Sequence, residues 1–532
     1  MGYITVGDKI DPSDWSLSPR YSAAEIAENV FKDLDKGNII LLHDGGGDRS
    51  QTVRALPLII DGIHARGYEI VPVSKLIDQT RAQVMPPLTT PREVLAARVD
   101  NLAFWMFSIV LIGVQMIFFL GDILMTGRLL IIGALATIDR IRGSSSQNLD
   151  PAFRPAIAVL IPAYNEEKVI ERTIRSVLAS SYRNLRVIVI DDGSKDRTLE
   201  IATSKFQNEI SAGKVVVLTK PNSGKAEALN YGLEQVTEDF YIGIDADTVI
   251  AREAIARLIP HFADRSIGAV AGNAKVGNRV NIWTRWQALE YITSQNFERR
   301  ALDLLGAVTV VPGALGAWRT EIVKKAGGYH AITVAEDADL TMNILRSGYR
   351  VIYEDRALAY TEAPVSARGL MRQRFRWSFG ILQAVWKNRG ALLRRGALGW
   401  FALPNIVIFQ IMLPLVSPLI DVMFIVSAVW YLIDRHFHPY AANPATFQKL
   451  VIYFVSFLII DFLASSLAFA LERRDPRQHE DYWLLADIWI QRFTYRQVFS
   501  VVLFKTIKRA IDGRAFSWEK LERTAALSHG GD

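Results

Sequence analysis

The 532-residue sequence contains no cysteine. Disulfides, thiolate metal sites and cysteine nucleophiles are therefore excluded, and the redox compartment is left open. The first 35 residues lack the basic and then apolar order of a secretory signal peptide. The sequence also has no lysine- and arginine-rich run with interleaved aromatic residues, so its modest net charge of +6 does not indicate a nucleic-acid partner.

Apolar residues are abundant by contrast. They make up 50% of the chain, and the mean hydropathy is +0.15 although 22% of the residues are charged. A chain of this length also exceeds what one ordinary hydrophobic core accommodates. The mixture predicts a soluble domain attached to membrane-spanning segments, with the basic excess on the cytoplasmic side.

Two apolar segments near the N-terminus predict membrane contact over residues 101–141, after a proline-containing linker at residues 86–100. Asn101–Gly121 carries no charge and has the length of a transmembrane helix. Ile123–Ile138 is apolar but contains Arg128, so it is a second span or an interfacial helix. We expect one crossing by the first segment and an interfacial position for the second; the alternative is a two-helix hairpin.

Residues 396–510 form a second apolar region. Gly396–Ile420 is uncharged but interrupted by prolines, Leu450–Leu471 is another span, and Tyr482–Phe504 is a weaker, charge-bearing one. Hydropathy predicts three or four C-terminal spans, with a cytoplasmic tail at residues 511–532. Together these segments predict a multi-pass protein of the inner or plasma membrane whose catalytic domain is cytoplasmic.

Residues 150–395 show a different pattern. Four apolar, β-branched runs at 157–161, 187–190, 215–218 and 241–244 follow one another at intervals of about thirty residues. Runs of this kind are typical of a parallel sheet that is covered on both faces. We therefore predict a doubly wound α/β domain whose ligands bind beyond the carboxyl ends of the strands.

Polar residues follow the predicted strands. Lys225 begins a helix after the third strand and could face a phosphate. Asp245 and Asp247 follow the fourth strand, and two carboxylates at this spacing can hold Mg²⁺ or Mn²⁺ against a diphosphate. The alternative for these two is a solvated acidic turn. The first two strands end in candidate ligands for a nucleotide, of which the acidic pair is also typical of a turn: Ala163, Tyr164, Glu166, Asp191 and Asp192.

The stretch Gln373-Arg374-Phe375-Arg376-Trp377 precedes the second apolar region. The guanidinium groups of Arg374 and Arg376 could hold a diphosphate, because their shape matches phosphate oxygens. Trp377 could stack under a sugar ring while Gln373 donates a hydrogen bond nearby. An amphipathic basic helix on an anionic lipid surface is the alternative interpretation.

Taken in order, these motifs resemble those of the processive family-2 glycosyltransferases, the membrane synthases of cellulose, chitin, hyaluronan and poly-N-acetylglucosamine. The resemblance covers roughly residues 104–523 and also includes Pro-Ala-Tyr-Asn-Glu, Gly-Lys-Ala-Glu-Ala-Leu-Asn and Glu-Asp-Ala-Asp-Leu-Thr. It implies a GT-A-like fold, a UDP-sugar donor, a divalent metal and an inverting mechanism. The implied partners are a growing polysaccharide acceptor, the lipid bilayer and, in some members, a small accessory membrane subunit.

The same resemblance implies residue roles. Asp337 would be the general base that deprotonates the acceptor hydroxyl, with Glu336 as its acidic neighbour or as a residue that orients the loop. Gly313 and Trp318 match the acceptor-facing loop, and Trp377 is the stronger candidate for stacking.

Apolar runs at residues 39–42 and 68–73 predict two short strands, and His43 follows the first of them. Residues 1–85 resemble the end of a NodB-type polysaccharide deacetylase, in which a Leu-His-Asp strand end supplies a catalytic histidine, and His43 matches that position. The metal-binding motifs of that family are absent, so we expect an inactive remnant. A deacetylase beside a synthase favours an N-acetylated polymer, hence N-acetylglucosamine from UDP-GlcNAc. The alternatives are a cellulose- or hyaluronan-type synthase, a non-processive lipid-linked sugar transferase, and a non-catalytic scaffold partner.

Overall fold

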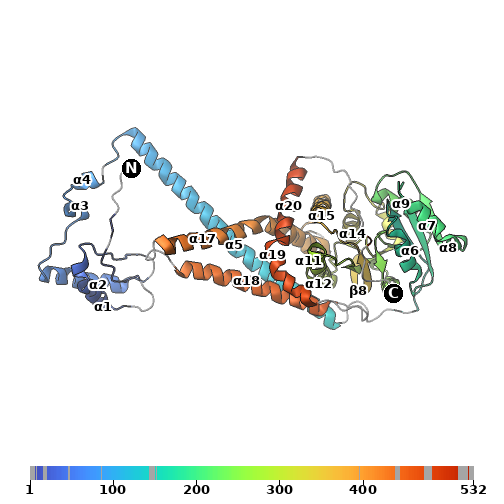
Figure 1. Cartoon of the computed structure of the whole chain (residues 1–532), viewed down its shortest axis with the longest axis horizontal. Helices are drawn as coiled ribbons and strands as arrows, with labels where there is room; N and C mark the ends of the chain where they lie inside the picture. Colours follow the sequence, from blue (N-terminus) through green and yellow to red (C-terminus); the bar gives the residue numbers. More distant parts are fainter. Residues whose placement is uncertain are drawn as a thin grey trace. The chain divides into compact units, whose positions relative to one another are not determined.

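The computed structural model describes residues 6, 7, 9–15, 21–45, 48–85, 87–142, 150, 152–394, 396–437, 444–472, 482–512 and 525. The chain divides into two compact units, Met1–Val114 and Gln115–Asp532 (Figure 1). The predicted tail at 511–532 lies almost wholly outside the described residues.

The first unit has a small helical core in which α1 packs on α2. Ser22 precedes α1 as its N-cap and forms a capping box with Glu25. The side chain of each residue accepts a hydrogen bond from the backbone N–H of the other. The strands predicted near residues 39–42 and 68–73 are not present, since Ile40 makes only an isolated bridge with Ile10. The helices of this unit are α1 (Ala23–Lys32), η1 (Leu34–Lys36), α2 (Ser50–Ala65), α3 (Val73–Leu76) and α4 (Arg81–Val84).

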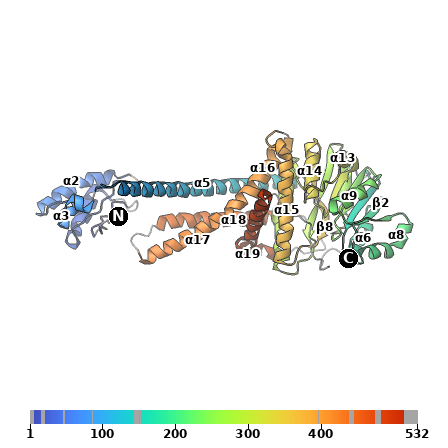
Figure 2. The same ribbon diagram turned by 90° about the horizontal axis from the view of Figure 1, so that it is seen from above.

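Helix α5 runs without interruption over the 52 residues Pro91–Arg142, about 78 Å at 1.5 Å per residue (Figure 2). Most of the predicted linker is therefore helical, and no turn at Asp122 separates two helices. The number of membrane crossings made by this part of the chain stays a prediction.

The second unit contains an eight-stranded mixed sheet in the order β3-β2-β1-β4-β7-β6-β8-β5. The four predicted strands are present and pair in parallel, which confirms the α/β prediction. The sheet is not wholly parallel, however, because β7 runs antiparallel to both of its neighbours. The strands are β1 (Ile157–Ala163), β2 (Leu185–Asp191), β3 (Val215–Thr219), β4 (Phe240–Gly243), β5 (Val249–Ile250), β6 (Ile267–Val276), β7 (Gly316–Arg319) and β8 (Arg350–Thr361).

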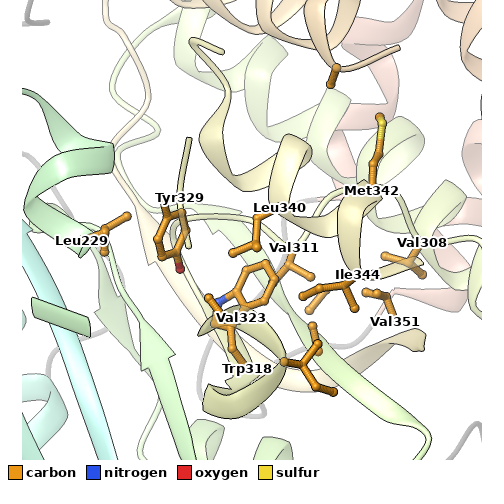
Figure 3. Packing of buried hydrophobic residues seen from close by; sticks show 14 of the residues in the cluster. Leu229, Val308, Val311, Trp318, Val323, Tyr329, Leu340, Met342, Ile344 and Val351 are labelled. Atoms are coloured by element: carbon orange, nitrogen blue, oxygen red, sulfur yellow. The ribbon is translucent and has the colours of Figure 1, made fainter. Parts of the chain in front are cut away.

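Alternate residues of the central strands enter two separate cores. Leu160 points into one core and Val159 and Ile161 into the other, as the period of two along a strand requires. Figure 3 shows part of the first core, with Trp318 and Tyr329 among aliphatic side chains. The first core is closed by α9 (Lys225–Glu234), α13 (Thr320–Lys325) and α14 (Glu336–Arg346), the second by α6 (Ile170–Leu178), α7 (Thr198–Ser204), α10 (Ala254–Leu258) and η3 (Ile259–Ala263).

Three segments of the described residues are long and apolar enough to cross a membrane: Phe119–Arg142, Leu398–Ile433 and Phe454–Leu471. The C-terminal region thus supplies two candidates, fewer than predicted. Tyr482–Phe504 is not one helix, because α19 ends at Phe493 and α20 begins at Tyr495. The span predicted at 101–121 includes residues 111, 114, 115, 117 and 118, whose side chains lie outside the described set.

The remaining helices lie around the sheet and along the candidate spans. Helix α15 packs against both α14 and α20, and α17 and α18 run side by side (Figures 1 and 2). Their bounds are α8 (Gln207–Ser211), α11 (Ile282–Glu290), η4 (Tyr291–Asn296), α12 (Phe297–Leu304), α15 (Ala367–Asn388), η5 (Arg389–Ala391), η6 (Leu398–Ala402), α16 (Leu403–Asn405), η7 (Ile406–Met412), α17 (Leu413–Phe437), α18 (Pro444–Leu471), η8 (Tyr482–Ala486), α19 (Asp487–Phe493) and α20 (Tyr495–Ile511).

Candidate active site

A polar recess lies where β1 and β4 end side by side. The strand order reverses direction at this pair, and open α/β sheets bind ligands at such a switch point. The recess brings together residues from five separate motifs of the sequence. Its lining includes Pro162, Lys225, Asp245, Pro312, Gly313, Glu336 and Asp337.

Lys225 is the cation of this recess. Its Nζ lies 2.7 Å from Asp245 Oδ1 and 3.0 Å from Glu336 Oε1, so it joins the end of β4 to the start of α14. Burial by itself would lower the pKa of this ammonium, but the charges of Asp245, Glu336 and Asp337 raise it well above its ordinary value. Lys225 is therefore charged at neutral pH and compensates part of the acidic cluster.

Gly313 lies between the two aspartates expected to act in chemistry. Its carbonyl oxygen accepts a hydrogen bond from the Asp245 N–H at 2.9 Å, and its own N–H donates to Asp337 Oδ2 at 3.3 Å. A Cβ at this position would meet Lys225 Nζ at 2.7 Å and the Asp245 carboxylate at 3.0 Å. The absence of a side chain here is what allows the Lys225–Asp245 pair to form.

Asp337 occupies the first turn of α14. Its carboxylate accepts hydrogen bonds from the N–H groups of Ala338 at 2.8 Å and Gly313 at 3.3 Å. Burial and, next, the negative charge of Glu336 raise the pKa of Asp337 to about 6. A carboxylate with this pKa is ionised at pH 7 and is more basic than an exposed aspartate.

Asp245 and Asp247 fit a divalent metal by their donor chemistry, since hard cations prefer carboxylate oxygens. Asp247 is 3% exposed, and its Oδ1 accepts hydrogen bonds from the Thr248 and Thr361 hydroxyls at 3.3 and 3.4 Å. No group of three or more histidine or acidic ligands exists within the described ranges. The two aspartates would need the oxygens of a diphosphate to complete a coordination sphere.

The ends of β1 and β2 are joined by hydrogen bonds that shape their loops. Asn165 adopts a left-handed conformation with φ of 54°, and its side chain accepts from the Lys195 N–H at 2.6 Å. The Asp192 carboxylate accepts from Lys220 Nζ and from the N–H groups of Ser223 and Gly224, the two residues before α9. Asp191 accepts from the Ser194 N–H and the Thr219 hydroxyl, while Ala163, Tyr164 and Glu166 lie at the end of β1.

The predicted diphosphate residues lie on α15, where residues two apart face different sides. Arg374 is 3% exposed, and its Nη2 lies 2.8 Å from Glu290 Oε2 on α11. Arg376 and Trp377 are half-buried, and Gln373 is buried. Arg374 thus pairs with a carboxylate whose side chain is 16% exposed, and the idea that both arginines hold one diphosphate stays a prediction.

Trp318 lies on β7 at 2% exposure and makes an edge contact with Tyr329 at 6.3 Å between ring centroids. Both side chains also belong to the lining of the recess. Contact of Trp318 with an acceptor stays a prediction.

Sequence reasoning missed the residues that fix the loop before α14. Asn230 donates to the Tyr329 carbonyl and accepts from the Tyr329 N–H, both at 2.8 Å. Gln383 of α15 bonds the backbone of Ile332 and Val334 at 3.2 and 3.1 Å. The side chains of Asn230 and Gln383 lie within or near the motifs described above. A single sequence, however, does not distinguish an asparagine or glutamine that fixes a loop from any other.

A second contact fixes α14 itself to α15. Lys387 Nζ lies 2.7 Å from Asp339 Oδ2, and His330 Nδ1 lies 3.0 Å from the same oxygen. The Asp339 side chain is fully buried. The helix that carries Asp337 is thus attached to the helix that carries Trp377.

In the first unit, His43 pairs with a residue that sequence reasoning did not identify. His43 Nδ1 lies 2.9 Å from Asp14 Oδ1, and the Thr52 hydroxyl donates to Asp14 Oδ2 at 3.0 Å. Burial opposes ionisation of Asp14, but the hydrogen bonds from His43 and Thr52 lower its pKa overall. The deacetylase remnant stays a prediction.

Comparison with known proteins identifies the α/β domain. Residues 155–380 match the model of the family described as "Glycosyltransferase like family 2". Over these residues the chain is similar to family 2 glycosyltransferases. With its mixed sheet, the domain has the GT-A-like fold that was predicted.

Relatives of the transferase domain carry names of synthases. The chain is 33% identical over 225 residues to poly-β-1,6-N-acetyl-D-glucosamine synthase of Staphylococcus aureus strain COL, covering 42% of this chain and 54% of that protein. It is 33% identical over 237 residues to the synthase of the same name in Staphylococcus epidermidis, covering 44% and 57%. The chain thus matches only about half the length of these curated relatives.

A solved structure is also similar to this chain. The mannosyltransferase PcManGT from Pyrobaculum calidifontis, in complex with GDP-Man and Mn²⁺, is 19% identical with a TM-score of 0.46. The similarity covers 75% of this chain and 96% of that one.

Proposed function

We propose that this chain is a membrane-bound, processive, inverting β-glycosyltransferase that polymerises N-acetylglucosamine from UDP-GlcNAc and exports the polymer. The observation that carries the proposal is the recess in which Asp245, Lys225 and Asp337 meet at the junction of β1 and β4. The names of the curated relatives support N-acetylglucosamine as the sugar. Candidate membrane spans on both sides of the transferase domain support its attachment to a bilayer.

The donor would bind across the ends of β1, β2 and β4. Ala163, Tyr164 and Glu166 would contact the nucleoside, with Asp191 and Asp192 shaping the loops beneath it. Arg376, which is more exposed than Arg374, would contact the diphosphate together with Gln373. This placement follows the rule that ligands of such sheets bind beyond the carboxyl ends of the strands.

Asp245 and Asp247 would hold Mg²⁺ or Mn²⁺, with Asp247 as the main protein ligand. Such an ion, when bound, neutralises negative charge that develops on the departing diphosphate. Lys225, at the start of α9, would supply further positive charge. Its ammonium pairs with Asp245, and the phosphate oxygens of the donor would compete with this carboxylate for it.

Asp337 would remove the proton from the attacking hydroxyl of the acceptor sugar. That oxygen forms a bond to the anomeric carbon while the bond from this carbon to the UDP oxygen breaks, which inverts the configuration. The raised pKa of Asp337 suits this role, because a base works best when its pKa is near the working pH. Trp377 would stack against the ring of the acceptor sugar.

The donor panel is the test of this function. Membranes that contain the chain are incubated with labelled UDP-GlcNAc, UDP-glucose or UDP-glucuronate, and the products are digested with linkage-specific hydrolases. We expect polymer from UDP-GlcNAc alone, degraded by a hydrolase specific for β-linked N-acetylglucosamine. Polymer from UDP-glucose instead would overturn the sugar assignment, and one sugar added to a lipid would overturn processivity.

A further inference from the structure

Arg374 and its neighbours form a buried group that the proposed chemistry does not use. The Arg374 guanidinium is 3% exposed and pairs with Glu290 of α11 at 2.8 Å. Glu290 Oε2 also accepts the Tyr495 hydroxyl of α20 at 2.5 Å. A buried charge requires a compensating partner, and here three helices supply the group.

The same guanidinium lies against Trp377. Its Cζ is 4.2 Å from the centroid of the indole, three residues further along α15. A cation at this distance is attracted to the face of an aromatic ring, and the attraction grows when water is excluded. A second aromatic ring, Phe499 of α20, lies 5.3 Å from the guanidinium carbon. Arg374 is therefore held between two rings and one carboxylate.

Two adjacent residues of α20 contact the candidate membrane helices. Arg496 Nη2 lies 2.8 Å from Asp461 Oδ2 on α18, and Gln497 Nε2 donates to Asp421 Oδ2 on α17 at 2.6 Å. The first turn of α20 thus connects the Glu290–Arg374 pair with two helices that are apolar enough to span a membrane. Polar contacts of the consecutive residues Tyr495, Arg496 and Gln497 therefore connect the surroundings of Trp377 with α17 and α18.

We propose that Arg374, fixed by Glu290 and Tyr495, is a positioning residue that sets the plane of Trp377 and thereby holds the acceptor end of the polymer. This inference rests on the proposed function. The partner it serves is the ring of a pyranose sugar, which stacks on the indole face that Arg374 does not cover. Arg374 makes no contact with the donor diphosphate, and this separates it from Arg376.

The experiment compares variants that alter each contact in turn. Tyr495→Phe removes one hydroxyl, Arg374→Lys keeps the charge without the planar guanidinium, and Arg374→Met removes the charge. Arg376→Met serves as the matched control on the same helix. For each variant, UDP affinity is measured by titration, the KM for UDP-GlcNAc and kcat are measured from UDP release, and product length is measured by gel filtration.

We expect the Tyr495 and Arg374 variants to keep the UDP affinity and the donor KM within about twofold of the parent while product length falls several-fold. Arg374→Lys should retain longer products than Arg374→Met. Arg376→Met should weaken UDP binding instead. The inference is overturned if Arg374→Lys and Tyr495→Phe leave product length unchanged, or if Arg374→Met weakens UDP binding as much as Arg376→Met.

The design separates this inference from the proposed function. If Arg374→Met fails to fold, the two milder variants still decide the outcome. If the parent protein makes no polymer from any UDP-sugar, the proposed function fails. In that case the UDP titration still decides whether Arg374 contacts the diphosphate.

Discussion

At the scale of single residues, the chemistry depends on how one carboxylate differs from its neighbours. Asp337 accepts two backbone hydrogen bonds and lies beside Glu336, whereas Asp245 is paired with Lys225. These surroundings assign different tasks to side chains of the same type. A buried aspartate beside a second carboxylate is suited to accept a proton, and an aspartate paired with a lysine is suited to bind positive charge.

Asp337→Asn should preserve the shape of the recess and remove the base. We expect polymer formation to fall by about 10²-fold or more, because general-base catalysis contributes that much. UDP binding should remain near the parent value, since the variant leaves Asp245, Lys225 and α15 unchanged. Polymer synthesis from labelled UDP-GlcNAc and a UDP titration measure the two quantities. Near-normal turnover would show that Asp337 is not the base.

The pKa of Asp337 predicts a pH profile. Because burial and Glu336 raise this pKa to about 6, the active carboxylate is lost as the pH falls through that value. We expect kcat/KM to rise through about pH 6 and level off above it, measured at saturating metal. The range from pH 5 to 7 extends about one unit on either side of the expected midpoint. A kcat/KM that stays constant over this range would contradict the assignment of Asp337 as the base.

The metal proposal has a separate test at Asp247. Excess EDTA should abolish transfer, and Mn²⁺ or Mg²⁺ should restore it in the parent chain. Asp247→Asn should bind Mn²⁺ more weakly in the presence of UDP, as measured by electron paramagnetic resonance of the free ion. Full activity in EDTA would be incompatible with a metal at this site.

At the scale of elements, α15 organises the site because it contacts α14 as well as α20. Gln383 fixes the loop before Asp337, and Lys387 pairs with the buried Asp339 on α14. The helix that carries the proposed acceptor contact therefore also positions the proposed base. A shift of about 1 Å between the two would reduce the rate, since transfer requires aligned reactants.

Lys387→Met should release this attachment. We expect kcat to fall by about tenfold with the donor KM nearly unchanged, because α14 loses its fixed position while the donor site is retained. Lys387→Arg should recover part of the rate. The control is Lys325→Met on α13, which removes an exposed ion pair with Glu321. Exposed pairs of this kind contribute little, so the control should leave kcat and KM unchanged. An equal kcat in the parent and the Lys387 variant would show that the contact is dispensable.

Elements differed in how well the sequence predicted them. The strands β1 to β4 were predicted from their apolar runs, which are largely buried on both faces in β1, β2 and β4 and only partly buried in β3. The strand β8 was missed because Glu354 and Asp355 interrupt its apolar pattern; the structure buries both and pairs them with His261 and Arg300. A charged residue within an apolar run usually indicates an exposed position. A single sequence does not show that a residue far away in the chain will neutralise that charge in the folded protein.

The same reasoning explains the site. Asp245 and Lys225 were predicted from motifs at a strand end and a helix start, whereas Gly313 and Asp337 were predicted from the family resemblance. All four residues line the same recess. The role of Arg374 was not predictable, because its direction depends on the helical period of α15 and on Glu290, 84 positions earlier in the sequence. Local pattern therefore predicts which residues carry chemistry better than it predicts which way they point.

At the scale of the whole molecule, the second unit has described helices that are long and apolar enough to cross a membrane. Along α17, the side chains of Leu419, Val422, Ile425 and Trp430 are each more than half exposed. An apolar surface of this kind is unfavourable in water and favourable in lipid. We infer that these helices lie in the bilayer and that the transferase domain meets UDP-sugars in the cytoplasm.

Cysteine labelling tests that location, because the chain has no native cysteine. A cysteine introduced at Ser204, exposed on α7 of the transferase domain, should not react with an impermeant maleimide in intact cells. It should react after permeabilisation. Labelling in intact cells would place the transferase domain outside the cytoplasm.

The most direct test of the central claim is the structure of the product made by the purified chain. The protein is reconstituted in lipid nanodiscs with Mn²⁺ and UDP-GlcNAc, and the product is analysed by mass spectrometry and by the anomeric signals in its NMR spectrum. The account predicts a polymer of many N-acetylglucosamine residues, all β-linked, since inversion converts the α-linked donor to a β-linkage. A product that is α-linked, or that stops after one sugar, would contradict it.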